Sequence, residues 1–284
     1  MPELSVIAAT DLSTRSEHVA GRAARIARDL GARLIVAHVC PPEGSAPPAL
    51  LVPLSKARGD AHTTARQALQ RIAERVGAEA RALEGEAPAA LAELARTENA
   101  ALLVLGLHRE RRVLDLLRLT TMERIVLRAP CPALIARSAP EHDYRCVLAP
   151  TDFSRASAEA LIVAARLAPK AERHAVHALQ MPLGSIFRPG HAETEAQLAS
   201  ADERMQAFLA TPGLPALTEP PVVVPGGVHE VLEFRRQDLG ADLLAIGANP
   251  GPDPRVLGNY ARDLMRAPQA DLLVAKPPVQ AAPT

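Results

Sequence analysis

The chain has 284 residues, 48% of them hydrophobic, and its 32 basic residues balance 32 acidic ones, so that the formal net charge is +0. This balance excludes a general attraction to nucleic acid or to an anionic membrane, and with 2% aromatic residues few side chains could stack on bases. Because no apolar run reaches the ~18 residues of a membrane-spanning helix and no secretory leader pattern is visible, we expect a cytoplasmic protein.

The first half of the chain predicts strands that alternate with helices. Ser13 or Thr14 can cap the first helix, Thr14 and Glu17 have the spacing of a capping box, and Gly31 marks the helix end. The second strand lacks polar alternation, which is typical of parallel strands covered on both faces. The predicted strands are 4–9, 33–39, 78–83, 102–105 and 133–136, and the predicted helices are 13–30, 54–76, 88–96 and 122–128.

The second half repeats the first. The sequence AATDLS at 8–13 returns as APTDFS at 149–154, an offset of 141 residues (152 minus 11). ALLVLG at 101–106 returns as DLLAIG at 242–247 with the same offset (247 minus 106). Solenoid repeats run only ~20–50 residues, so the long period indicates two homologous domains, expected at 1–139 and 140–284. The predicted second-half strands are 146–149, 174–179, 222–224, 243–246 and 272–275.

This alternation predicts the α/β class, with two tandem, doubly wound, five-stranded parallel sheets. Ligands of such sheets lie at the carboxyl ends of the strands, where the strand order reverses. Asp11 and Gly106 in the first half, and Asp152 and Gly247 in the second, follow strands that should end there.

The motifs and their order resemble the universal stress protein family. The resemblance rests on a strand ending in Thr-Asp-x-Ser, a strand ending in His38-Val39, an apolar strand closing on Gly106, and Ala129-Pro130-Cys131-Pro132 before the last strand. Both halves match, so it covers nearly the whole chain. It implies domains of the adenine nucleotide α-hydrolase-like type that pair through strands 133–136 and 272–275 as an intrachain pseudo-dimer, and a further homodimer is a weaker expectation.

Some members of this family bind ATP through a segment G-x2-G-x9-G-[S/T], in which backbone N–H groups and a helix N-terminus cradle phosphates. The resemblance also implies that the aspartate after the first strand contacts adenine. ATP or another adenine nucleotide is therefore the candidate cofactor, and a small molecule or nucleotide the expected partner. The candidate nucleotide-binding residues are Asp11, Val39, Gly106, Arg109, Thr120, Asp152, Ala178, Gly247, Gly258 and Asn259.

Both halves depart from this glycine pattern. In the first, Arg109 and Leu119 replace the second and third glycines, and only Thr120 keeps the hydroxyl. In the second, the stretch from Gly247 to Gly258 is two residues shorter, and its three prolines lack an N–H group. We therefore expect weak ATP binding, weaker in the second half than in the first.

The charged run 108–112 contains three candidate anion ligands: Arg109, Arg111 and Arg112. Their guanidinium groups could hold an anion directly, or they could fill the phosphate pocket and close it. Charge runs are also commonly solvated surface features.

Other interpretations compete for the remaining polar residues. Asp11 and Asp152 could instead satisfy the N-terminus of the following helix. His38 and His177 are typical of core histidines, and His174 and His177 should lie on opposite faces of one strand, so no metal site is predicted. The three cysteines form no CxxC pair and fit small buried positions.

The sequence favours a protein that is not an enzyme, because no nucleophile with its base is visible. It predicts a tandem universal stress protein, a stress-response binding module with degenerate nucleotide-type pockets. Two alternatives remain: an adenine-nucleotide sensor that uses Asp11 or Asp152, and a slow ATP hydrolase.

Overall fold

The computed structural model describes residues 3–13, 16–40, 54–107, 119–137, 139–179, 192–248 and 258–276. The chain divides into two compact units, Met1–His142 and Asp143–Thr284. The boundary expected after residue 139 lies close to this division. The expected pairing of strands 133–136 and 272–275 concerns how the two units are arranged, and it stays a prediction.

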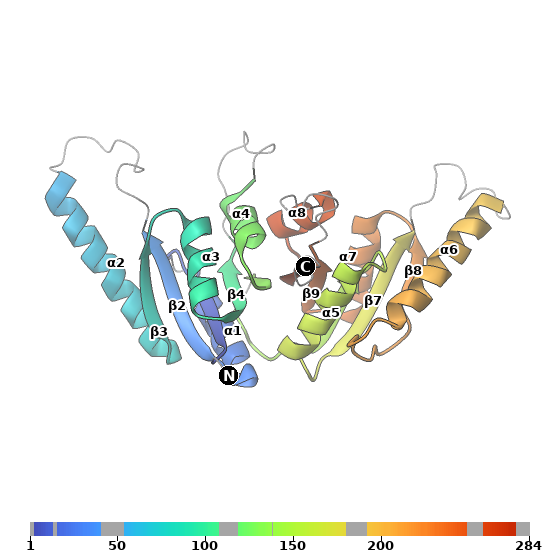
Figure 1. Ribbon diagram of the computed structural model, residues 1–284, viewed down its shortest axis with the longest axis horizontal. Helices are drawn as coiled ribbons and strands as arrows, with labels where there is room; N and C mark the ends of the chain where they lie inside the picture. The colour runs from blue at the N-terminus through green and yellow to red at the C-terminus, as the bar shows by residue number, and fades with distance from the viewer. Residues whose placement is uncertain are drawn as a thin grey trace, which may run out of the picture. The chain divides into compact units, whose positions relative to one another are not determined.

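The first unit is one parallel sheet with helices on both faces (Figure 1). Its strand order is β3-β2-β1-β4-β5, so the order reverses between β1 and β4. Right-handed crossovers put α1 and α2 together on one face and α3 and α4 on the other. The strands are β1 (Ser5–Ala9), β2 (Arg33–Cys40), β3 (Glu79–Glu84), β4 (Ala100–Gly106) and β5 (Ala133–Ala136), and the helices are α1 (Glu17–Leu30), α2 (Leu54–Val76), α3 (Ala87–Thr97) and α4 (Thr121–Arg128).

The second unit repeats this winding, with the strand order β8-β7-β6-β9-β10, and all its neighbouring strands are parallel. The predicted fold class, two doubly wound five-stranded parallel sheets, is therefore confirmed. The strands are β6 (Cys146–Pro150), β7 (Glu172–Leu179), β8 (Val222–Pro225), β9 (Leu243–Gly247) and β10 (Asp271–Ala275), and the helices are α5 (Arg155–Leu167), α6 (Ala192–Leu209), α7 (Val228–Leu239) and α8 (Asn259–Arg266).

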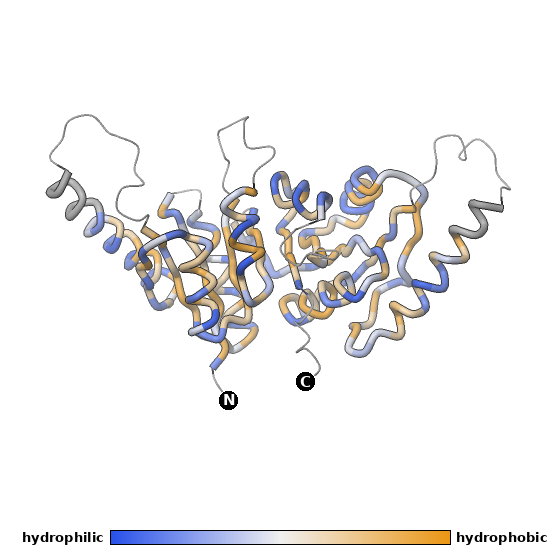
Figure 2. The backbone as a smooth tube through the Cα atoms, turned by 45° about the horizontal axis from the view of Figure 1, so that its top comes forward, coloured by the Kyte–Doolittle hydropathy of each residue, from blue (hydrophilic) through white to orange (hydrophobic). Residues whose placement is uncertain are grey.

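The core of each unit is its central strands, which Figure 2 shows as the most hydrophobic part of the chain. Ile7, Ile35 and Leu103 in the first unit, and Leu148 and Leu244 in the second, are at most 1% exposed. Burying one such side chain contributes about 1.5–3 kcal/mol, so the apolar runs fix the sheets. In the part of the chain that is described, no helix has both the length and the hydropathy to cross a membrane.

The predicted start of the first helix is wrong. Helix α1 begins at Glu17, and its N-cap is Ser16, not Ser13 or Thr14; Thr14 lies outside the described residues. The reason is a turn: Leu12 has a φ of 62°, and the Ser13 N–H donates to the Asp11 side chain, so the backbone at Ser13 is not yet helical. The predicted end is confirmed, because Gly31 is in the left-handed conformation that closes helices.

Candidate functional site

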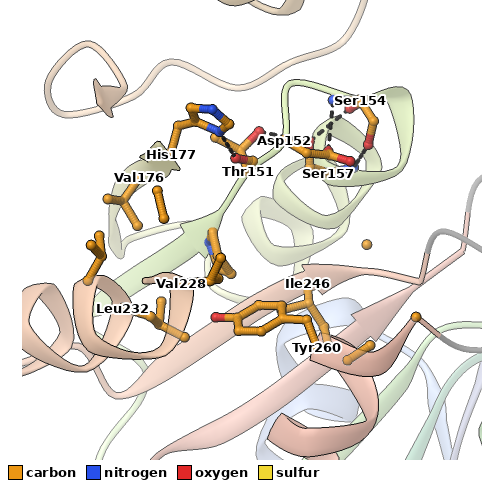
Figure 3. A pocket seen from close by; sticks show the side chains of 16 residues that line it. Thr151, Asp152, Ser154, Ser157, Val176, His177, Val228, Leu232, Ile246 and Tyr260 are labelled. Atoms are coloured by element: carbon orange, nitrogen blue, oxygen red, sulfur yellow. Dashed lines mark hydrogen bonds between the residues drawn. The ribbon is translucent and has the colours of Figure 1, made fainter. Parts of the chain in front are cut away.

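Each unit has a pocket at the carboxyl ends of its central strands. The first pocket, about 660 Å³, lies between the ends of β1, β2 and β4 and the helices α3 and α4. The second, about 280 Å³, lies between the ends of β6, β7 and β9 and the helices α7 and α8 (Figure 3). Both are at the point where the strand order reverses, which is the usual ligand site of such sheets.

The same positions of the repeat line both pockets. The equivalent pairs are Thr10 and Thr151, Asp11 and Asp152, His38 and His177, Val39 and Ala178, Leu91 and Leu232, Leu105 and Ile246, and Gly106 and Gly247. Of the predicted site residues, the structure thus brings Asp11, Val39 and Gly106 together in one pocket. It brings Asp152, Ala178, Gly247 and Gly258 together in the other.

The two aspartates sit in matching turns. The Asp11 Oδ1 atom accepts hydrogen bonds from the Ser13 N–H (3.0 Å) and the Ser13 hydroxyl (2.6 Å), and Asp152 Oδ1 accepts one from the Ser154 N–H (2.9 Å). These are Asx turns and not helix caps: the cap of α5 is Ser154, whose hydroxyl accepts from the Ser157 N–H. A carboxylate has about four lone-pair sites, so the turn at Asp152 leaves acceptor capacity on the pocket side.

Both turns store backbone strain. Leu12 and Phe153, the residues after the aspartates, have φ values of 62° and 63°. A bulky residue in this left-handed region costs on the order of 1–3 kcal/mol, and such strain commonly marks ligand-binding turns. The threonine before each aspartate holds the turn, since its Oγ1 accepts the N–H of Leu12 (3.0 Å) or Phe153 (2.8 Å).

The two pocket histidines fix the turns from the neighbouring strand. His38 Nδ1 lies 2.9 Å from the Thr10 carbonyl, and His177 Nδ1 lies 2.7 Å from the Thr151 carbonyl. A carbonyl only accepts, so Nδ1 must carry the proton, which leaves Nε2 as an acceptor in the neutral ring. Nowhere in the described ranges do three His, Cys, Asp or Glu side chains form a group that could hold a metal ion.

The glycines that end β4 and β9 are needed for packing. A Cβ atom on Gly247 would lie 2.3 Å from the backbone carbonyl of Ala156 and 2.7 Å from the Ser157 nitrogen. A Cβ on Gly106 would lie 3.0 Å from Cγ2 of Val19. The start of the first helix in each unit passes so close to the strand end that glycine is favoured there without any phosphate.

The helices that border the pockets begin differently. In α4, Thr120 Oγ1 accepts the Glu123 N–H (3.1 Å), and the fully buried Glu123 carboxylate accepts the Thr120 N–H (2.6 Å). Thr120 therefore caps the helix, and its neighbour Thr121 lines the pocket instead. In α8, Gly258 is the N-cap and lines the pocket without a capping side chain, whereas Asn259 does not line it.

The remaining predicted residues lie outside the described residues. These are the candidate anion ligands Arg109, Arg111 and Arg112, and the three prolines of the second glycine-containing stretch. The predictions of anion binding and of weak ATP binding therefore stay untested.

Sequence reasoning missed the pocket residues that come from helices: α3 and α4 in the first unit, and α7 and α8 in the second. In the second pocket these include Leu232 and Tyr260, and in the first Leu91 and Met122. Burial raises the pKa of the Tyr260 hydroxyl far above its usual range. No local pattern marks these positions, because they reach the pocket only through helix packing.

Residues 5–137 match the model of the universal stress protein family. A solved universal stress protein from Archaeoglobus fulgidus is similar over 96% of this chain and 98% of its own, with 17% identity and a TM-score of 0.63. A candidate universal stress protein from Pseudomonas aeruginosa is similar over 98% and 94%, with 20% identity and a TM-score of 0.59. A shorter universal stress protein solved in complex with cAMP covers 49% of this chain with 25% identity and a TM-score of 0.37. Among curated proteins, none matches this chain.

Proposed function

We propose that the chain is a tandem, non-enzymatic ligand-binding protein of the universal stress protein type that acts in a stress response, and that each unit holds one adenine-type ligand. The observation that carries this is the recurrence of one pocket at one position of both sheets, with a threonine, an aspartate and a histidine in the same places. The family match over residues 5–137 and the fold shared along both lengths support it.

The chemistry of the pockets fits an amine-bearing heterocycle. Asp11 and Asp152 carry carboxylates at the edge of the pockets, and a carboxylate only accepts hydrogen bonds when ionised. The Nε2 atom of each pocket histidine is a further acceptor whenever the ring is neutral, because Nδ1 donates to the turn carbonyl. Apolar side chains such as Leu91 or Leu232 form the opposite wall, against which a flat ring can pack. Adenine combines a flat ring with an exocyclic amine that donates two hydrogen bonds.

A second candidate function is an ATP sensor, in which the phosphates would extend past the start of α4 or α8. The start of α8 favours it in the second unit, because no side chain caps the helix beside the pocket there. A slow ATP hydrolase remains the alternative that the same experiment tests.

The test is calorimetric titration of the full chain with adenosine, AMP and Mg-ATP. Asp11→Asn and Asp152→Asn remove the charge of the carboxylate without breaking the turn, because an asparagine oxygen can still accept the turn hydrogen bond. We expect two sites in the natural chain, and at each substituted site a roughly ten- to hundredfold loss of affinity, as for one charge-assisted hydrogen bond.

Three outcomes would contradict the proposal. If the natural chain binds none of the three probes, the pockets do not serve adenine compounds. If both variants bind as the natural chain does, the carboxylates are not the recognition groups. Steady phosphate release from Mg-ATP by the same samples would show an enzyme.

A further inference from the structure

The second pocket has a buried hydroxyl group that its own unit leaves without a hydrogen bond. The Tyr260 hydroxyl is inaccessible to solvent, and it has no hydrogen-bond partner among the residues the structure describes. Its ring packs against His229, with ring centroids 5.1 Å apart. Figure 3 shows the hydroxyl directed toward the apolar side chains of Leu232 and Val228, across the pocket from the Thr151-Asp152 turn.

The other tyrosine of the chain shows what this fold does with a buried phenol that has only a structural role. The sequence has 2 tyrosines and no tryptophan. Tyr144 is buried, whereas Tyr260 is half-buried with only its hydroxyl fully covered, and the Tyr144 hydroxyl donates to the Asp271 carboxylate at 2.6 Å. Buried hydroxyl groups are normally satisfied in this way, because leaving one unpaired is costly. An unpaired hydroxyl in a pocket wall therefore points to a partner that arrives with a ligand.

The first pocket differs at this position. Tyr260 is the second residue of α8, and Met122 is the second residue of α4. Met122 lines a cavity of about 660 Å³, and Tyr260 lines one of about 280 Å³. Drug-sized ligands occupy cavities of roughly 300–1,000 Å³, so the second pocket suits a smaller ligand than the first.

We propose that Tyr260 determines the specificity of the second pocket, which takes a heterocycle of nucleoside size. Apolar side chains cover the Tyr260 hydroxyl in the free protein, so the ligand displaces one of them on binding. A polar atom of the ligand then hydrogen-bonds to the hydroxyl while its amine faces Asp152. The phenol is both donor and acceptor, so it can pair with a ring nitrogen or with a sugar hydroxyl. The first pocket makes no such bond, because Met122 has no hydroxyl, and its size admits larger ligands. This inference rests on the proposed function.

The test measures adenosine binding to the full chain carrying Asp11→Asn. This substitution weakens the first pocket, so that the second pocket dominates the measured binding. Tyr260→Phe should weaken adenosine binding about five- to tenfold, the effect of one hydrogen bond. The same substitution should leave the melting temperature of the free protein unchanged or raise it, because it removes an unpaired buried group. A structural role of the hydroxyl would have the opposite effect on stability.

Tyr144→Phe is the matched control, since it removes the same atom from a hydrogen-bonded site. It should lower the melting temperature and leave adenosine affinity unchanged. In this variant, tyrosine emission comes from Tyr260 alone, because the chain has no tryptophan. Adenosine should therefore change the emission of Tyr144→Phe and leave that of the Tyr144→Phe, Tyr260→Phe double variant unchanged.

The outcomes separate the two proposals. If the natural chain does not bind adenosine, the proposed function fails and this inference fails with it. If adenosine binds in the Asp11→Asn chain and Tyr260→Phe leaves the affinity unchanged, only the role of Tyr260 fails. If Tyr260→Phe lowers the melting temperature as much as Tyr144→Phe does, the hydroxyl has a structural partner, and the inference is overturned.

Discussion

The two pockets share a polar rim and differ in their walls. Both units keep the Thr-Asp turn, its left-handed residue and the histidine that binds the turn carbonyl. The first pocket nevertheless has more than twice the volume of the second, and Met122 in the first stands where Tyr260 stands in the second. The rim depends on hydrogen bonds between the threonine, aspartate and histidine side chains and the backbone, whereas the walls are side chains on helices. The repeat has therefore kept the polar rim and changed the walls and the volume of the pocket.

The units also differ in how tightly the first helix approaches the sheet, and this difference predicts the largest effect on stability. Gly247→Ala places a Cβ 2.3 Å from backbone atoms of Ala156, which cannot rotate away. We expect a loss of at least about 1–3 kcal/mol, the usual cost of overpacking. Gly106→Ala meets only side-chain atoms, Cγ2 of Val19 at 3.0 Å and Cβ of Ser16 at 3.8 Å, so its cost should be below about 1 kcal/mol. Urea unfolding of each variant measures the difference.

Gly21→Ala is the control for this pair. Gly21 lies inside α1, and an added Cβ would be 3.6 Å from Pro140, an ordinary contact. It should stabilise the protein by about 0.5–1 kcal/mol through helix propensity. Equal costs for Gly106→Ala and Gly247→Ala would show that both helix starts can move, and that the close approach at Gly247 does not explain its glycine.

The next largest effect on stability is expected at the N-terminal caps of α4 and α8, the helices beside the pockets. Glu123→Ala removes the reciprocal cap of α4 and leaves the Thr120 N–H without its carboxylate, so we expect a loss of about 1–2 kcal/mol. In the second unit, Gly258→Thr should add a cap to α8 and gain a few tenths of a kcal/mol. Thermal unfolding of both variants provides the comparison. A Glu123→Ala chain as stable as the natural one would mean that the cap contributes nothing.

Sequence reasoning predicted the elements better than their ends. The bounds of α2 and β5 were predicted to the residue, because apolar periodicity is a local signal. The start of α1 was wrong because nothing in the sequence indicates that Leu12 adopts a positive φ. Thr120 was predicted as a ligand hydroxyl, although Thr-x-x-Glu is itself a capping-box pattern.

The lining of the pockets could be predicted only in part, because local sequence signals indicate strand ends and do not indicate how helices pack. Asp11 and Asp152 line the pockets, because strand ends and the reversal of strand order follow from the element sequence, and their role in binding stays a prediction. Tyr260 and Leu91 were missed, since their approach depends on how α8 and α3 pack against the sheet. Packing of this kind is a property of the whole fold and leaves no mark on neighbouring residues.

The smallest predicted effect on stability comes from an ion pair on α7 that has no counterpart at the equivalent positions of α3. Glu233 and Arg236 stand on α7 where the 141-residue offset puts the buried Ala92 and Ala95 of α3. The Arg236 guanidinium donates to Glu233 at 2.7 and 2.9 Å, and with the Gln237 amide it lowers the pKa of Glu233 from 4.5 to about 2. Because the folded pKa is depressed, this pair stabilises the protein above about pH 4.5, and the contribution is lost as the pH falls through 2.

The expected size is below about 1 kcal/mol, because the Glu233 side chain is 37% exposed and water screens the pair. The measurement compares the stability of Glu233→Gln with that of the natural chain between pH 2 and pH 7, with Glu203→Gln on the surface of α6 as the control for losing one carboxylate. The stability difference for Glu233→Gln should be constant above pH 5 and shrink toward zero near pH 2. A difference that stays constant down to pH 2 would mean that the arginine does not hold the Glu233 carboxylate in the folded state, and that this pair does not stabilise α7.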